Sequence, residues 1–430
     1  MKRLAIAIFA ISGALAGEMP QVRLLPSPFK DNMMRERRFL ESLHPLALTR
    51  QFRVNMGLGL VPEDEFVMPL GGWEAPDIEI RGHSCGHYLS GMASLYEATG
   101  DESVRRRAAE VVHILRKCQQ NGKTGYLSAF PEEHIDKIIR GKRTWAPWYA
   151  LHKILAGLID QYELCGNEEA LEAAVDFGRW AAAKTLALSP EEAATMRRFE
   201  FGGIAESLIR LAKLAKNDDF RRAAEVFHDE AVFGPIDGKH ANTLIPKMIA
   251  EWHRGEKERV EAFWREVAGH YMYAPGCVSE KEAFRGPDRQ ADFLTGRTGE
   301  TCCTYNLLKL SRLLFAETPR ADIADYQERA LFNHILGQME PLDGNLTYFM
   351  PVMTGSYKLQ SRPNDSFWCC VGSSMESHTR YHRLVCAEAA GELYINLYIP
   401  SEIKWRGLVL RLETRFPEES TARLSVVDGE

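Results

Sequence analysis

The chain has 430 residues with a hydrophobic content of 45 %, which is enough to bury a large core, and its length favours two or three domains. This composition argues against a disordered protein. Its formal net charge of −6 comes from interspersed acidic and basic residues, which argues against nucleic acid or an anionic membrane as the principal partner. A neutral or sugar-like ligand fits this composition better.

The first 16 residues have the pattern of a signal peptide. Lys2 and Arg3 precede an apolar run over residues 4–15, and small residues before Gly17 provide a cleavage site. The alternative is a buried N-terminal helix, because the apolar run is short for a membrane span. We therefore expect an exported protein, periplasmic or secreted, with no membrane span once the signal peptide is removed.

Between about residues 40 and 336, apolar residues recur at three- and four-residue spacing between short polar turns, which predicts a succession of helices. A loose helix-turn-helix repeat covers residues 95–112, 161–175, 211–226 and, more distantly, 313–330. Its turns carry Gly or Asn, as at helix C-caps, and Asp or Glu opens the second helix. Such hairpins predict a solenoid or, if the array closes, a toroid of inner and outer helices.

After Gly337 the pattern changes to strands. We expect a hairpin over residues 346–352 and 355–359, and further strands at residues 392–399, 408–412 and 422–427. These strands predict the start of a β-domain. They are too few to close a sandwich and would leave exposed edges, so we expect the chain to be a C-terminally truncated form of a longer protein.

The nine cysteines include two adjacent pairs, which cannot easily form a relaxed disulfide within the pair. Glu300 and Cys302 are two positions apart, and Cys369 and Cys370 add two thiols from a distant segment. Together these four side chains could form a zinc site of three sulfurs and one oxygen, which would protect the thiols of an exported protein. The alternative is a set of buried, reduced cysteines that act as small hydrophobes.

Several separated motifs then resemble one family. They comprise residues 300–306 (ETCCTYN) and 366–372 (SFWCCVG), the latter followed by Glu376 and His378, and also residues 71–74 (GGWE), 81–90 (RGHSCGHYLS), 125–131 (GYLSAFP), 145–153 (WAPWYALHK) and 240–243 (HANT). In this order they resemble glycoside hydrolase families 127 and 146, the β-L-arabinofuranosidases. The resemblance covers nearly all of the chain after the signal peptide.

The resemblance implies a mainly α-helical protein, an (α/α)6 barrel followed by a β-sandwich. We assign residues 17–388 to the barrel and 389–430 to a partial sandwich. The resemblance also implies a Zn²⁺ ion held by Glu300, Cys302, Cys369 and Cys370. Cys369 corresponds to the nucleophile, and Glu282, in a Glu-x-Phe context, corresponds to the general acid/base.

The chemistry of those residue types fits these roles. A zinc-bound thiol is a thiolate at neutral pH and can attack an anomeric carbon, while Glu282 protonates the departing oxygen and then activates water from the same face. This is the two-step retaining scheme with sulfur as nucleophile. Glu280 and Asp288 lie nearby and stay open as alternatives to Glu282, and Cys303 stands where another residue type is expected.

Sugar recognition needs convergent polar groups beside an aromatic or apolar surface. The candidate substrate-binding residues are His83, His87, Trp145, His152, Glu200, Glu206, His240 and Asn242. Singly, each could instead be a packed or hydrogen-bonded structural residue.

We therefore expect a retaining exo-glycosidase that releases β-L-arabinofuranose from plant-type oligosaccharides or polysaccharides. One alternative is the same mechanism on another pectin-derived sugar. A second is a non-catalytic glycan-binding protein with a structural zinc, which would not require Glu282. A third is an isomerase or lyase on the same toroid, which would use catalytic His or Tyr without the thiolate cluster.

Overall fold

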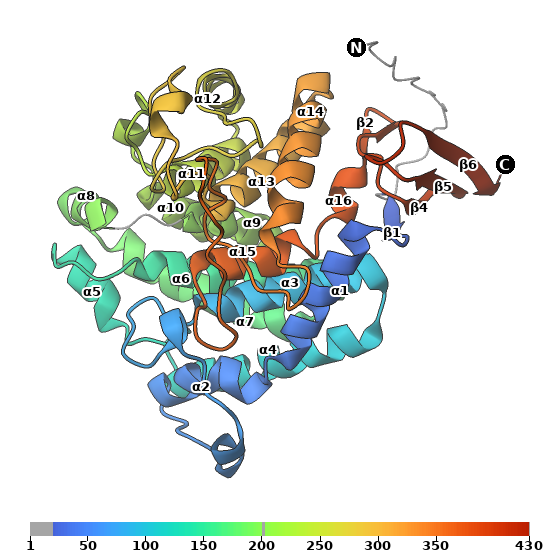
Figure 1. The fold of residues 1–430 in the computed structure, drawn as a ribbon. Coiled ribbons are helices and arrows are strands. Elements are labelled where there is room, and N and C mark those ends of the chain that lie inside the picture. Colours follow the sequence, from blue (N-terminus) through green and yellow to red (C-terminus); the bar gives the residue numbers. More distant parts are fainter. Residues whose placement is uncertain (1–19, 200–202, 430) are drawn as a thin grey trace.

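The computed structural model of the protein describes residues 20–199 and 203–429. The predicted signal peptide and Glu200 lie outside the described residues. The described chain is mainly helical, with a small antiparallel sheet beside the helices (Figure 1). None of its described helices is long and apolar enough to cross a membrane.

Six helices form an inner ring. They are α3 (His83–Thr99), α6 (Pro147–Cys165), α9 (Ile204–Ala215), α11 (Ala241–Arg254), α13 (Thr301–Glu317) and α15 (Cys369–Ser377). Each helix contacts the next, and α15 contacts α3, so the ring closes. The predicted toroid is therefore confirmed, including the closure that the repeats left open.

Each inner helix packs mainly against one outer helix. The outer partners, in the same order, are α4 (Glu102–Gly122), α7 (Glu168–Leu186), α10 (Asp218–Val226), α12 (Lys257–His270), α14 (Ala321–Ala330) and α1 (Pro28–Ser42). The partner of α15 thus comes from the N-terminal part of the chain, whereas each of the others directly follows its inner helix. Five sequential hairpins and one long-range pair make the (α/α)6 barrel.

Shorter elements fill the connections. The helices are α2 (Pro45–Asn55), α5 (Glu133–Ile139), α8 (Pro190–Phe199) and α16 (His382–Val385), and the single turns are η1 (Pro62–Phe66), η2 (Gly72–Glu74), η3 (Glu230–Phe233), η4 (Gln290–Phe293), η5 (Leu331–Ile335) and η6 (Leu336–Gln338). The longest connections join the hairpins at the end of the barrel where the inner helices begin.

The repeated turns behave as predicted at two hairpins. Gly100 ends α3 with a φ of 69°. Asp101 then caps α4, because its side chain accepts a hydrogen bond from Ser103 N in the first turn of that helix. Gly166 and Asn167 do the same between α6 and α7. Between α9 and α10 the left-handed residue is Lys216. Local capping therefore defines these hairpins.

The small sheet joins the two ends of the described chain. Its strand order is β1 (Gln21–Leu24), β4 (Ser401–Trp405), β5 (Leu408–Thr414) and β6 (Ala422–Asp428), all antiparallel. A separate two-stranded sheet consists of β2 (Cys386–Ala389) and β3 (Glu392–Ile395). Figure 1 shows β1, in blue, beside the dark red β4. Val22 pairs with Ile403 and Ile403 with Leu410, and these buried side chains belong to the same hydrophobic core as the barrel. Two of the predicted strands match β5 and β6, β3 is shorter than predicted, and β1, β2 and β4 were not predicted.

The predicted hairpin over residues 346–359 is wrong as a regular ladder. Only an isolated bridge joins Thr347 to Gln360, and the segment instead pairs with the residues before α13. Thr301 N donates to Tyr348 O at 3.1 Å, and Met350 N donates to Gly299 O at 2.9 Å. The backbone groups that a hairpin would have used are thereby satisfied by another part of the barrel.

The closest helix contact in the ring is between α3 and α6. A Cβ on Gly86 would lie 2.1 Å from the carbonyl carbon of Lys153, and one on Gly157 would lie 2.5 Å from the Gly86 carbonyl oxygen. Backbone atoms cannot move aside as a flexible side chain can. Glycine at both positions therefore sets the distance between these helices.

We expect Gly86→Ala to lower the free energy of unfolding by about 3 kcal/mol, because the added methyl group overpacks the helix contact. Urea denaturation monitored by circular dichroism measures this change. Gly269→Ala is the matched control, since Gly269 is also helical and a Cβ there meets nothing within 4 Å. Equal denaturation midpoints for Gly86→Ala and the unmodified protein would contradict the close-packing argument.

Candidate active site

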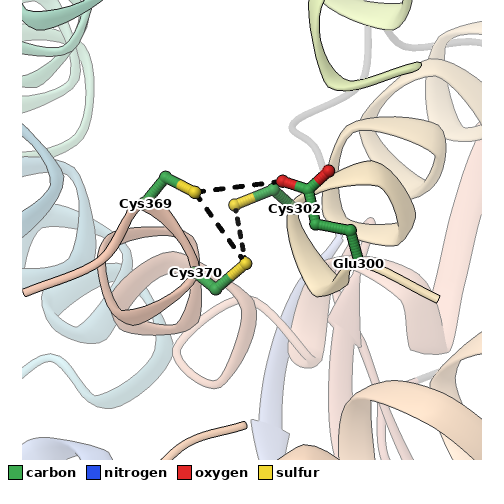
Figure 2. A group of neighbouring side chains, drawn as sticks. All are labelled: Glu300, Cys302, Cys369 and Cys370. Atoms are coloured by element: carbon green, nitrogen blue, oxygen red, sulfur yellow. Dashed lines mark hydrogen bonds between the residues drawn. The ribbon is translucent and has the colours of Figure 1, made fainter. Parts of the chain in front are cut away.

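Four buried side chains of metal-ligating types meet where two inner helices begin. Glu300 precedes α13 and Cys302 lies in its first turn, while Cys369 and Cys370 open α15. One ligand atom from each lies within 4.8 Å of the others (Figure 2). The Cys302 and Cys370 sulfurs are 3.3 Å apart, and Cys369 Sγ is 3.9 Å from Glu300 Oε1. The four predicted metal ligands are thus brought together from distant segments.

A glycine-rich segment positions the start of α15. Trp73 N donates to Ser366 O at 3.1 Å. Gly72 has a φ of 53°, and a Cβ there would lie 2.0 Å from Asp365 O, so only glycine fits against this backbone. Phe367 also has a positive φ, 43°, which a bulky residue rarely adopts. The motif at residues 71–74 therefore determines how the two cysteines enter the site.

The cluster gathers negative charge in a buried place. Burial raises the pKa of the Glu300 carboxyl well above its ordinary value, and the nearby negative charges of Cys369 and Glu282 raise it further. Burial also raises the pKa values of Cys302 and Cys370, whereas hydrogen bonds from these two thiols hold the pKa of Cys369 well below its ordinary value. Cys369 is therefore the thiol most readily ionised. Three sulfurs and one carboxylate within reach of one centre fit a divalent metal ion, which would supply the compensating charge.

Neighbouring side chains hold the Glu300 carboxylate in place. Asn242 Nδ2 donates to Glu300 Oε1 at 3.0 Å, and Asn306 Nδ2 donates to Asn242 Oδ1 at 2.9 Å. The Cys303 thiol donates to Glu300 Oε2 at 3.1 Å. Asn242, predicted to bind substrate, thus contacts a predicted metal ligand, and Cys303 has a role as a hydrogen-bond donor to the same carboxylate.

Glu282 lies across the site from the cysteines. Both Lys281 and Glu282 have positive φ values, 47° and 68°, which turn this segment sharply. The Tyr348 hydroxyl donates a short hydrogen bond to the Glu282 carboxylate and lies 3.3 Å from Cys369 Sγ. His240 Nε2 is 3.3 Å from Glu282 Oε2. One tyrosine therefore connects the predicted nucleophile with the predicted acid/base.

The two alternative carboxylates have other partners. Glu280 is buried and accepts a hydrogen bond from the Thr295 hydroxyl at 3.2 Å. Asp288 is exposed and pairs with His270 Nδ1 at 2.9 Å. Of these three carboxylates, only Glu282 is joined to the cluster through Tyr348.

Two predicted substrate-binding histidines lie on α3. His83 Nδ1 is 3.1 Å from the Glu74 carboxylate. His87 is held by Glu376, 2.6 Å from Nδ1, and by the Tyr149 hydroxyl, 3.2 Å from Nε2. Burial lowers the pKa of His87 to about 4, so its imidazole is neutral. Because both nitrogens of the neutral His87 ring are hydrogen-bonded, His87 holds Glu376 and Tyr149 in position.

Aromatic side chains border the cluster. Trp73, Tyr149 and Tyr348 pack against the three sulfurs. Trp145 meets Trp73 edge to face with 4.6 Å between ring centroids, and it is 40 % exposed. The predicted substrate-binding Trp145 therefore stands at the outer rim of an aromatic wall that leads to the cysteines.

His152 and Glu206 lie deeper in the barrel. His152 Nε2 is 3.7 Å from Glu206 Oε2, and Lys309 Nζ pairs with the same carboxylate at 3.0 Å. In the described part of the chain, no hydrogen bond or ion pair joins these residues to the cysteine cluster. They line a separate cavity instead.

The sequence interpretation missed the contributions of Tyr348 and Tyr149. Tyr149 lies inside the quoted motif at residues 145–153, so its position was available, but not its contact with His87. Tyr348 lay in a predicted strand, and the sequence carried no signal that it would reach Glu282 and Cys369. Trp73 lies in the motif at residues 71–74, but the sequence predicted no role for it.

Comparison with known proteins adds independent findings. A sequence profile described as the GH127 β-L-arabinofuranosidase catalytic domain matches residues 21–383. Ara127N-Se, a GH127 β-L-arabinofuranosidase from Geobacillus stearothermophilus T6, is similar in structure with a TM-score of 0.73 and 16 % identity, over 95 % of this chain and 72 % of that chain. The GH127 β-arabinofuranosidase BT3674 gives a TM-score of 0.72 and 17 % identity, over 95 % and 68 %.

A heparin-specific unsaturated glucuronyl hydrolase is a more distant structural match, with a TM-score of 0.50 and 13 % identity over 82 % of this chain and 95 % of that chain. No curated protein sequence matches the chain. At such identities the structural matches show the fold alone, whereas the sequence profile spans most of the chain, including Glu282 and the four clustered residues. The chain therefore belongs to the GH127 β-L-arabinofuranosidase family of glycoside hydrolases.

Proposed function

We propose that this glycoside hydrolase is a retaining exo-glycosidase that releases β-L-arabinofuranose from plant-type glycans. Cys369 is the nucleophile and Glu282 the general acid/base. The observation that carries the proposal is the Tyr348 hydroxyl, which lies 3.3 Å from Cys369 Sγ and donates to the Glu282 carboxylate. A closed structural metal site would need neither the tyrosine nor the glutamate. The sugar is the one named for the family and for its relative from Geobacillus.

The metal ion in this proposal is Zn²⁺, held by Glu300, Cys302, Cys369 and Cys370. Zinc prefers tetrahedral sites of this composition. When bound, it would keep the Cys369 thiol ionised, the state that the neighbouring thiols already favour. Export to an oxidising compartment, which the N-terminal sequence predicts, gives such protection of the thiols a further use.

In the first step, the Cys369 thiolate attacks the anomeric carbon and forms a carbon–sulfur bond. The bond from that carbon to the leaving oxygen breaks, and the proton of Glu282 goes to this oxygen. In the second step, Glu282 takes a proton from water while the water oxygen attacks the same carbon and the carbon–sulfur bond breaks. Two inversions give retention of configuration.

Tyr348 and His240 position the carboxyl for both steps. Hydrogen bonding to His240, and then to Tyr348, lowers the pKa of Glu282. The lower pKa favours the carboxylate form, which activates water in the second step. It also means that Glu282 loses the proton needed for the first step at a lower pH. The aromatic wall of Trp73 and Trp145 offers the apolar surface on which a sugar ring can rest.

Metal content can be tested with two adjacent cysteines. We expect Cys302→Ser to lose zinc, since it removes a ligand, and Cys303→Ser to keep it, since a serine hydroxyl can still donate to Glu300 Oε2. Elemental analysis of the purified proteins, with and without a chelator, measures this. Equal zinc content in the two variants would argue against the ligand assignment.

The roles of Cys369 and Glu282 can be separated with p-nitrophenyl β-L-arabinofuranoside. Nitrophenolate leaves without acid assistance, so Glu282→Gln should release a burst and then stall, with hydrolysis of the sugar–enzyme bond slowed by about 10²- to 10⁴-fold. Peptide mass spectrometry should find the sugar on Cys369. Glu280→Gln is the control and should turn over normally, because Glu280 is bonded elsewhere. A label on another residue, or ordinary turnover by Glu282→Gln, would refute the assignment.

The pH dependence gives a further test. The basic limb of the kcat/KM profile reports the loss of the Glu282 proton. Because His240 lowers the pKa of Glu282, His240→Gln should raise that pKa and move the basic limb to higher pH. Initial rates across the pH range measure the shift, with His270→Gln as a control at an exposed histidine paired to Asp288. A limb that stays in place or moves to lower pH would contradict this role of His240.

A further inference from the structure

A cavity of about 1020 Å³ lies inside the barrel, away from the cysteine cluster. Its walls run from the first two turns of inner helices, with His152 on α6 and Glu206 on α9, to the last turns of α3, α6 and α13, with Glu97, Asp160 and Arg312. Strands β1 and β2 close one side. The inner helices that carry the cluster begin at the catalytic end. The cavity therefore extends toward the opposite end of the barrel, and none of the four clustered residues lines it.

The carboxylates that face this cavity already have cationic partners. Asp160 pairs with both Arg210 and Arg380, at 2.7 and 2.9 Å, and Arg380 also pairs with Glu376 at 2.7 Å. Glu206 pairs with Lys309 at 3.0 Å. Each of these carboxylates in the cavity wall is therefore balanced by a cationic side chain.

One of the arginines that line the cavity lacks a partner. Arg312, in the last turns of α13, has no hydrogen-bond or ion-pair partner among the described residues, and its side chain is exposed to the cavity. Protein nevertheless surrounds it. Burial, with the positive charges of Arg383 and Arg380 nearby, outweighs the attraction of Glu97 and lowers the pKa of Arg312 to about 9. Glu97 already pairs with His382 and Arg383, so the enclosed guanidinium has no counter-charge of its own. Such a charge is unfavourable, and a bound anion would relieve it.

We propose that the cavity is a binding site for a small oxyanion-bearing molecule, with Arg312 as its anchor. A guanidinium binds a carboxylate or a phosphate through two parallel N–H bonds, a geometry that lysine cannot provide. The volume is that of a small-molecule pocket, and Leu164, Ile249 and Leu308 add apolar wall for the body of an organic ligand. The proposal does not rest on the glycosidase mechanism.

Titration calorimetry of the whole protein in chloride buffer, with inorganic phosphate and with glucuronate as separate probes, tests this site. We expect saturable binding of at least one probe and a weakening of about tenfold or more in Arg312→Gln. Arg312→Lys, which keeps the charge but not the two parallel donors, should bind with intermediate affinity. Binding by phosphate alone would assign the site to a phosphate group, and binding by glucuronate alone to a carboxylate.

Thermal unfolding adds a readout that a purely structural arginine would not give. Without anion, Arg312→Gln should have an equal or higher Tm than the unmodified protein, because it removes an unpaired enclosed charge. With anion, only the unmodified protein should gain stability. Arg222→Gln, at an exposed residue paired with Asp219, is the matched control and should behave as the unmodified protein.

Failure of both probes to bind saturably, or equal affinity in Arg312→Gln and the unmodified protein, would overturn the proposal. Glu282→Gln should bind the probes normally, so a failed glycosidase assignment and a failed anion site give different results.

Discussion

The approach of α15 to the start of α13 is the constraint on which the rest of the structure depends. It closes the helical ring, and it places Cys370 against Cys302 although 68 positions separate them in the chain. Three thiols and a carboxylate in a buried place repel one another once ionised, so this contact is costly without a cation. Ring closure and metal binding would therefore be parts of one arrangement, since a cation bound by these four side chains would also hold the two helices together.

Supporting residues keep that arrangement precise. Gly72 and Phe367 adopt left-handed backbone conformations so that α15 can begin directly at Cys369. Asn242 donates a hydrogen bond to one oxygen of the Glu300 carboxylate, and Cys303 donates to the other. These side chains leave little freedom for the ligands, which is what a site needs if a ligand is also to react.

The parts of the fold that the sequence predicted are those set by neighbouring residues. The turns at Gly100 and Gly166 could be recognised because a left-handed cap and the following N-cap lie side by side in the chain. Pairing of β1 with β4 could not, because Val22 and Ile403 carry no local sign of each other. The hairpin expected around residues 346–359 failed for the same reason, since its apolar alternation was real but its backbone partners are Gly299 and Thr301.

The same distinction applies to the site. The four predicted ligand residues could be identified by type and motif, and the structure brings them together. His152 and Glu206 have equally suitable side chains, yet His152, in the second turn of α6, and Glu206, in the first turn of α9, face the barrel cavity instead of the cysteine cluster. Composition does not record which way a side chain points. The helix α15 shows that one element can serve separate places: Cys369 opens it at the cluster, Glu376 near its end contacts His87, and Arg380 beyond it lines the barrel cavity. Glu376 contacts both His87 and Arg380, so the charge balance of the cavity is connected to the residues that support the cysteines.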